Sequence, residues 1–260
     1  SMYSIYFDTE KAKWSSWTSL ISREPFDPNL EAHEIIVPTV DTTRYTYLFD
    51  TFCKNAILNH DLNRMAILLC GPTGTGKTVY INNHCLHGLS TDKFNVISLG
   101  FSAQTSAMQT QEIIESKLDK RRKGVFGPPI GKTVITFVDD LNMPTKETYG
   151  AQPPIEILRQ FMDHGGWFEL KEKTFLRIED MMYVAAMGPP GGGRTFITPR
   201  FLRWFNVISV TEFDNEAMMA IFSAIMKHVF DKNQVPTNIK GQQSNAIQAT
   251  MDVYESALQT

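Results

Sequence analysis

The chain has 260 residues and a formal net charge of −3 at pH 7, with 42% hydrophobic and 20% charged residues. These values are typical of a soluble globular protein with one large domain, or one domain and a smaller appendage. The small charge gives no general attraction to nucleic acid or to an anionic membrane. No apolar stretch approaches the ~20 residues that a membrane-spanning helix needs. We therefore expect neither nucleic acid nor a membrane among the partners.

Cysteine use and the N-terminal region indicate a reducing compartment. The three cysteines, Cys53, Cys70 and Cys85, form no CxxC pair, so we expect neither a disulfide framework nor a zinc site. Buried thiols in a reducing compartment are the simplest interpretation. The N-terminus has no secretory signal pattern. Residues 1–33 are predicted to be a leader that packs on a neighbouring element, because tryptophans and prolines are scattered there among polar residues.

Five short apolar runs, separated by helical patterns, dominate residues 34–211. Such runs are typical of strands that are buried on both faces of a parallel sheet. Strands that alternate with helices predict a doubly wound α/β sheet. The predicted strands are 65–70, 94–99, 133–138, 181–187 and 205–210, and the clearest predicted helices are 46–58, 106–122 and 154–164.

After residue 212 the apolar runs stop and two further helical patterns follow, over 215–230 and 245–258. The second pattern ends without a glycine or proline terminator, which predicts that residues 212–260 begin a small helical subdomain that continues beyond Thr260. The basic segment 117–124 is expected to be the solvated end of a helix, where cations favour the helix dipole. A phosphate or partner contact is its alternative role.

The sequence GPTGTGKT at residues 71–78 matches the phosphate-loop pattern G-x-x-x-x-G-K-[ST] in full. A predicted strand precedes it and a helical pattern follows it. Glycines let such a loop curl until its N–H groups converge on an anion, and the next helix presents its positive end. Lys77 is expected to reach the outer phosphates, and Thr78 to offer its hydroxyl to magnesium. The predicted nucleotide-binding residues are Gly71, Pro72, Thr73, Gly74, Thr75, Gly76, Lys77, Thr78 and Val79.

The third strand, in the sequence VITFVDDLNMP, ends in two adjacent carboxylates. A carboxylate at the end of a buried strand is costly unless it is paired or near a metal. Phosphate-loop NTPases place the acid that holds magnesium at such a strand end, and this predicts that role for Asp139. Asp140 would then face the attacking water, which a base must approach to within ~3 Å. Because aspartate is one methylene shorter than glutamate, a competent base and an inactive residue both remain open for Asp140.

Two further segments contain arginines near the carboxyl edge of the predicted sheet. GPPGGGRT at residues 188–195 looks like a second phosphate loop with Arg194 in place of lysine, but Pro199 and the missing helical pattern favour a flexible loop. TPRFLRWF places Arg200 and Arg203 just before the fifth strand. An arginine there could stabilise transition-state charge at the site of a neighbouring subunit or module. Arg200 is the preferred candidate, and a surface ion pair is the alternative.

In this order, the motifs resemble the AAA+ ATPase family, and more specifically one module of a dynein heavy chain. GPTGTGKT, the long segment FVDDLNMPTKETYGAQPPIEILRQFMDHGGWF, AAMGPPGGGR and TPRFLRWFNV look like the third AAA+ module of an axonemal dynein. IIVPTVDTTRY is similar to the dynein segment that precedes a module and wraps the adenine. The resemblance covers roughly residues 34 to 230.

The resemblance implies a five-stranded parallel P-loop NTPase sheet flanked by helices over residues 34–211, followed by part of a small helical subdomain. It implies ATP or ADP with Mg²⁺ as the cofactor. By motif position, Pro38 and Thr39 would lie near the adenine. Thr78 and Asp139 would bind the metal, and Lys77, Asp140 and Arg200 would be the catalytic residues.

Two departures from the family pattern concern the γ-phosphate. The family often has a polar sensor, commonly asparagine, at the end of the fourth strand, and Gly188 takes that place here. The second sensor, an arginine of the small subdomain, is expected beyond Thr260.

The implied function is an ATP-binding, slowly hydrolysing module in the cytoskeleton of the cilium axoneme, whose nucleotide state regulates force production on microtubules. Its expected partners are neighbouring AAA+ modules of the same heavy chain, other dynein subunits, and microtubules through regions outside this chain. Alone, it is expected to be weak or inactive, because a neighbour's arginine can be worth ~10³–10⁵ in rate. The alternative is a structural module that holds ADP or ATP without turnover. An AAA+ protein that acts on nucleic acid is a third hypothesis, disfavoured because the sequence lacks a basic, aromatic-rich stripe.

Overall fold

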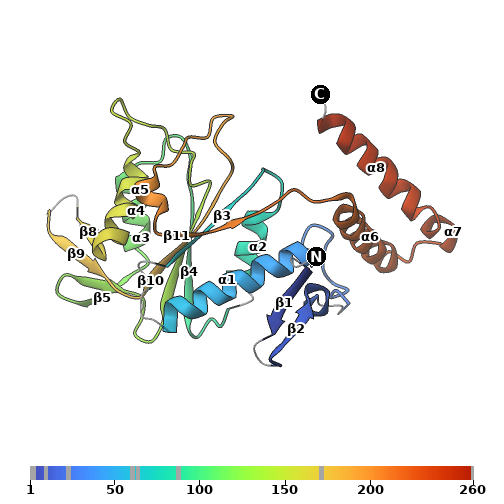
Figure 1. Ribbon diagram of the computed structural model, residues 1–260, viewed down its shortest axis with the longest axis horizontal. Helices are drawn as coiled ribbons and strands as arrows, with labels where there is room; N and C mark the ends of the chain where they lie inside the picture. Colours follow the sequence, from blue (N-terminus) through green and yellow to red (C-terminus); the bar gives the residue numbers. More distant parts are fainter. Residues whose placement is uncertain are drawn as a thin grey trace. The chain divides into compact units, whose positions relative to one another are not determined.

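The computed structural model describes residues 4–8, 11–21, 25–58, 62, 65–85, 89–169 and 173–258. The chain divides into two compact units, one made of residues 46–211 and the other of residues 1–45 together with 212–260. Figure 1 shows the elements of both. Among the described residues, no helix combines the length and the apolar character needed to cross a membrane. The predicted division at residues 33 and 211 stays a prediction.

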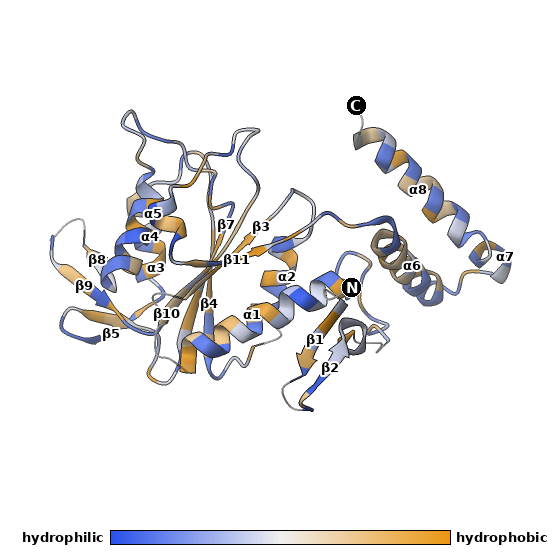
Figure 2. Ribbon diagram, in the orientation of Figure 1, coloured by the Kyte–Doolittle hydropathy of each residue, from blue (hydrophilic) through white to orange (hydrophobic). Residues whose placement is uncertain are grey.

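A five-stranded parallel sheet forms the centre of unit 46–211, in the order β11-β3-β10-β7-β4. All five predicted strands are therefore confirmed, with ends that shift by a residue. Most residues of β3, β7 and β10 are buried, as expected for inner strands covered on both faces, and Figure 2 shows these strands as mainly hydrophobic. The strands are β3 (Ala66–Cys70), β4 (Phe94–Gly100), β7 (Thr133–Asp139), β10 (Met181–Met187) and β11 (Phe205–Ser209).

Helices cover both faces of this sheet (Figure 1). On one face lie α3 (Ala107–Glu115), α4 (Pro153–His164) and the short α5 (Pro199–Leu202); on the other lie α1 (Val40–Leu58) and α2 (Lys77–Asn83). The main hydrophobic core lies between the first face of the sheet and these helices. Phe161 of α4 is fully buried there and contacts the rings of Trp167 and Tyr183. The doubly wound α/β architecture is confirmed.

Local sequence signals set the ends of two of these helices. Ser106 and Gln109 form a reciprocal capping box at the start of α3. Proline occupies the first turn of α4, where its missing N–H is not needed, and Gly165 ends the helix in a left-handed conformation with φ 70°. The α4 boundaries therefore follow from the sequence, and the predicted helix 154–164 is confirmed.

The predicted helix over 106–122 is wrong in its second half. The helix ends at Glu115, and the basic segment forms strand β5 (Asp119–Arg122) of a second, four-stranded sheet. Arg121 forms an ion pair with Asp180 and also donates to the carbonyl of Pro128. Strand pairing and these contacts override the local helical pattern. The other strands are β6 (Val125–Gly127), β8 (Gly166–Phe168) and β9 (Phe175–Ile178).

The other unit combines a hairpin with helices. Residues 26–31 lie against α6: Phe26 stacks edge-on against His228, whose Nε2 is 3.0 Å from the Leu30 carbonyl, and Lys232 pairs with Glu31 at 2.7 Å. The predicted helices 215–230 and 245–258 are confirmed with slightly longer bounds. The elements are β1 (Ile5–Asp8), β2 (Lys13–Ser16), the 3₁₀ helix η2 (Trp17–Leu20), α6 (Asn215–Lys232), α7 (Thr237–Lys240) and α8 (Gln243–Leu258).

A hydrogen-bond network around the carboxylate of Asp163 connects α4 to the segment that leads into β11. Asp163, whose side chain is only 11% exposed, accepts hydrogen bonds from Arg159, Arg203 and the Trp204 indole. Burial alone would raise the pKa of this carboxyl, but the three donors hold the pKa below its usual range. A lowered folded-state pKa means that the carboxylate stabilises the fold above its unfolded pKa, and that this contribution is lost as the pH falls through the folded pKa.

Replacing Asp163 with asparagine is expected to lower the free energy of unfolding at pH 7 by about 1–3 kcal/mol, because charge-assisted bonds to a largely buried acceptor are lost. The difference from the wild type should shrink as the pH falls from the unfolded-state pKa of about 4 toward the lower folded-state pKa, at which the native carboxylate becomes protonated. Urea unfolding at pH 7 and at a series of pH values from about 4 down to about 2 measures this change. Asp119→Asn, an exposed carboxylate on β5, is the matched control, and an equal effect of the two variants at pH 7 would contradict this account.

Candidate functional site

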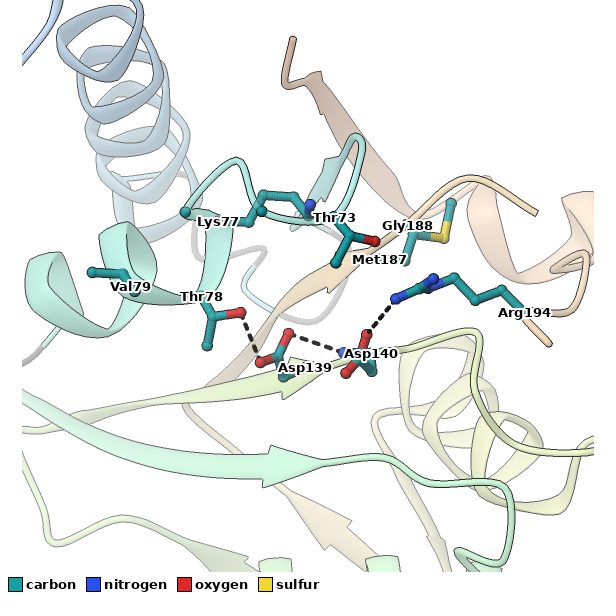
Figure 3. A pocket seen from close by; sticks show the side chains of 11 residues that line it. Thr73, Lys77, Thr78, Val79, Asp139, Asp140, Met187, Gly188 and Arg194 are labelled. Carbon is teal, nitrogen blue, oxygen red and sulfur yellow. Dashed lines mark hydrogen bonds and ion pairs between the residues drawn. The ribbon is translucent and has the colours of Figure 1, made fainter. Parts of the chain in front are cut away.

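A pocket of about 270 Å³ opens at the carboxyl edge of the central sheet. Parallel strands all end at this edge, so the segments that follow β3, β7 and β10 converge there. Figure 3 shows the side chains around it. The lining residues are Thr73, Gly74, Gly76, Lys77, Thr78, Val79, Asp139, Asp140, Met187, Gly188 and Arg194.

The loop between β3 and α2 has a shape that its glycines permit. Gly74 and Gly76 have φ of 84° and 75°, a region that other residues rarely adopt. At Gly71 an added Cβ would lie 2.2 Å from the carbonyl oxygen of Val210, so the close approach of the chain after β11 also requires glycine. Gly71, Pro72 and Thr75 do not line the pocket; Thr75 is buried and donates to the carbonyl of Pro72. These three residues shape the loop.

Lys77 lies over this loop with its ammonium group turned toward loop oxygens. It donates to the carbonyl of Gly71 at 2.9 Å, to that of Pro72, and to the hydroxyl of Thr75 at 3.2 Å. Burial lowers the pKa of Lys77, an effect that nearby Asp139 opposes. Because an ammonium group binds phosphate oxygens more strongly than neutral carbonyls, this cation suits an anion in the pocket.

The hydroxyl of Thr78 and the carboxylate of Asp139 meet across the pocket at 2.8 Å, although 61 positions separate them in the chain. The second oxygen of Asp139 accepts the backbone N–H of Asp140 at 3.0 Å. A hydroxyl beside a carboxylate is a pair of hard oxygen donors of the kind that Mg²⁺ prefers. The residues present therefore fit a magnesium–phosphate group, as the sequence predicts for Thr78 and Asp139.

Asp140 follows in a left-handed backbone conformation, with φ 50°. Aspartate tolerates this region better than most residues. Its side chain is half exposed, lines the pocket, and lies 3.8 Å from the guanidinium of Arg194. A carboxylate in this position can face a water molecule in the pocket, or be held by the arginine.

Sequence reasoning missed Arg194 and Met187 as pocket residues, whereas it had placed Gly188 near the γ-phosphate by its motif position. The carbonyl of Met187 accepts the N–H of Gly71 at 3.2 Å, which places the loop after β10 directly beside the phosphate loop. In the sheet Met187 pairs with Cys70. The available signal was the position of GPPGGGRT: a segment that follows an inner strand adjacent to β3 must begin at this pocket.

The other predicted site residues lie outside this pocket. Arg200 is exposed and forms no hydrogen bond or ion pair with any residue that the structure describes. Arg203 instead pairs with Asp163 and lies over the Trp204 ring, 4.8 Å from its centroid, so the surface ion pair is its role here. Pro38 and Thr39 belong to the unit that contains residues 1–45, and Thr39 caps the start of α1 through reciprocal hydrogen bonds with Thr42. Their adenine role stays a prediction.

A glycine-rich loop after a buried strand, with its lysine and threonine facing the acidic end of another strand, defines the class of P-loop nucleotide-binding proteins. The comparison with known proteins narrows this class. The family described as "P-loop containing dynein motor region" matches residues 24–213, and the chain belongs to that family.

Individual relatives are axonemal dynein heavy chains. The chain is 44% identical to dynein axonemal heavy chain 12 of Rattus norvegicus over 255 residues, which is 98% of this chain. It is 45% identical to dynein axonemal heavy chain 3 of Homo sapiens over 100% of this chain. It is 49% identical to dynein axonemal heavy chain 1 of Homo sapiens over 84% of this chain. The matched regions are 8%, 6% and 5% of those relatives, so this chain corresponds to a small part of such a protein.

Proposed function

We propose that this chain is an ATP-binding, slowly hydrolysing AAA+ module of an axonemal dynein heavy chain, in the position of the third module. The observation that carries the proposal is the contact of Thr78 with Asp139 beside Lys77, because it joins the phosphate loop to the acidic strand end. When bound, Mg²⁺–ATP supplies the reactive terminal phosphoryl group and a metal that neutralises its charge.

Each residue has a separate role in this proposal. Lys77 binds the outer phosphates, Thr78 and Asp139 hold the metal, and Asp140 orients water. Arg200 serves the site of an adjacent module, which its exposed position without partners among the described residues supports. Pro38 and Thr39 contact the adenine.

The context of the proposal is a longer heavy chain in the axoneme of a cilium. Nucleotide state would regulate force production on microtubules, through neighbouring modules and through regions outside this chain. Neighbouring modules and other dynein subunits are then the partners. The names of the relatives support this context.

The alternative is a structural module that retains nucleotide without turnover. Asp140 favours this alternative, because it is shorter than glutamate and lies 3.8 Å from Arg194. A single-turnover assay on the intact motor, with its other sites disabled, separates the two. We expect Asp140→Asn to slow hydrolysis about tenfold or more, since a positioned base contributes at least this much.

The matched control is Asp92→Asn, an exposed carboxylate before β4, which should leave the rate unchanged. Measurable wild-type hydrolysis that survives Asp140→Asn would exclude Asp140 as the base. No hydrolysis in the wild type would favour the structural alternative.

A further inference from the structure

The loop after β10 returns one arginine to the pocket through a turn built of glycines. Gly191, Gly192 and Gly193 have φ of 122°, 56° and 86°, conformations that residues with a Cβ would adopt at a cost. Gly191 and Arg194 exchange backbone hydrogen bonds of 3.1 and 3.0 Å, which close the turn. This geometry places Arg194 among the pocket residues, as Figure 3 shows.

Because Gly188 has no side chain, the Arg194 side chain can occupy the space beside it. A Cβ at Gly188 would lie 2.7 Å from the Nε of Arg194 and 2.9 Å from its Cδ. Two hydrogen bonds of Asn142 fix the base of the loop. Its side-chain amide donates to the carbonyl of Gly188 at 2.8 Å, and its backbone carbonyl accepts the N–H of Thr195 at 2.9 Å. Arg194 thus lies against the position where the AAA+ pattern puts a polar sensor, and a residue larger than glycine there would displace it.

Arg194 has donors that its present contacts do not use. Its Nε is buried and makes no hydrogen bond to any residue the structure describes. Its closest anion is Asp140, and the separation of 3.8 Å is too long for a hydrogen bond. Both oxygens of Asp139 are already engaged, by Thr78 and by the N–H of Asp140. A partly buried guanidinium with a buried, unused Nε donor, facing the same pocket as Lys77, is suited to a phosphate oxygen.

We propose that Arg194 binds the terminal phosphate of a nucleotide in its own module. It would take the place of the polar sensor residue that Gly188 cannot supply. Without that phosphate, Arg194 holds Asp140 in a loose ion pair. With it, the guanidinium binds the phosphate oxygens and Asp140 is released to face water. This inference rests on the proposed function, because it assigns a phosphate-binding residue to the same nucleotide site. It predicts that Arg194 raises the affinity for a nucleoside triphosphate over that for a diphosphate, and that this preference depends on Asp140.

Calorimetric titration with MgADP and with magnesium adenylyl imidodiphosphate, a non-hydrolysable triphosphate, tests the proposal without measuring turnover. Arg194→Ala should weaken the triphosphate analogue about tenfold more than MgADP, or about 1.4 kcal/mol. Arg194→Lys, which keeps the charge but loses the planar fork, should recover part of this difference. Arg177→Ala removes an exposed arginine from β9 and is the charge-matched control.

A double-mutant cycle tests the link to Asp140. Asp140→Asn removes the competing anion, so it should strengthen binding of the triphosphate analogue, and this gain should disappear when Arg194 is also alanine. An Arg194→Ala variant that weakens both nucleotides equally, or neither, would overturn the sensor role. A gain from Asp140→Asn that persists without Arg194 would overturn the link. If instead wild-type protein binds neither nucleotide, the proposed function itself fails.

Discussion

Lys77→Ala is expected to weaken MgADP binding by about 100-fold, or about 2.7 kcal/mol. The ammonium group is partly buried, lines the pocket, and is held only by oxygens of its own loop in the described structure. Hydrogen bonds to charged groups are worth about 1.5–3 kcal/mol, and alanine supplies none of them. Isothermal titration calorimetry on the wild type and the variant measures the difference.

Lys120→Ala is the matched control, because Lys120 is an exposed lysine on β5, outside the pocket. It should bind MgADP like the wild type. Thermal unfolding of both variants shows whether the loop substitution also affects the fold. An affinity of Lys77→Ala within about threefold of the wild type would mean that the nucleotide site lies elsewhere.

Phe161→Ala is expected to lower the free energy of unfolding by about 3–5 kcal/mol. Phe161 is fully buried on α4, with ring centroids 6.2 Å from Trp167 and 5.1 Å from Tyr183. Truncation leaves a cavity between α4 and β10, where the surrounding strands cannot collapse without losing their register. Urea unfolding of the chain measures the loss.

Phe168→Ala provides the comparison at a surface. Phe168 is 49% exposed, and its aromatic neighbour among the described residues is Phe175, at 5.3 Å, so its removal should cost about 1 kcal/mol. Equal losses for the two phenylalanines would show that α4 does not cover the central sheet as described. Because β10 and β7 carry the ends that form the pocket, Phe161→Ala should also weaken nucleotide binding at temperatures near its unfolding transition.

The central sheet could be predicted because its inner strands are buried on both faces and leave continuous apolar runs in the sequence. Residues 66–70 and 181–187 are of this kind, and hydrophobic burial decides their structure. The strand β5 could not be predicted in this way. Its sequence, DKRR, has no apolar alternation, and it is held by pairing with β6 and by the ion pair of Arg121 with Asp180. The pairing with β6 is local, since Arg122 lies opposite Val125, but the ion pair arises only once segments 59 positions apart in the chain meet.

The same distinction applies to the site. The phosphate loop and Asp139 follow from motif and position, because the loop's chemistry restricts the residue types. Arg194 does not, since its place depends on a turn of three glycines and on the absence of a side chain at Gly188, against which it packs. The adenine role of Pro38 and Thr39 and the action of Arg200 on a neighbour rest on resemblance, and both remain predictions. The sequence left open whether Asp140 is a competent base or an inactive residue. The structure adds its ion pair with Arg194, so the answer depends on whether that pair separates when nucleotide binds.

The structure of this chain bound to MgADP tests the central claim most directly. The account predicts the phosphates within the loop of residues 71–78, next to the ammonium of Lys77, and the metal beside the hydroxyl of Thr78 and the carboxylate of Asp139. Nucleotide bound elsewhere, or a loop that keeps Lys77 on its own carbonyls while MgADP occupies another surface, would contradict it.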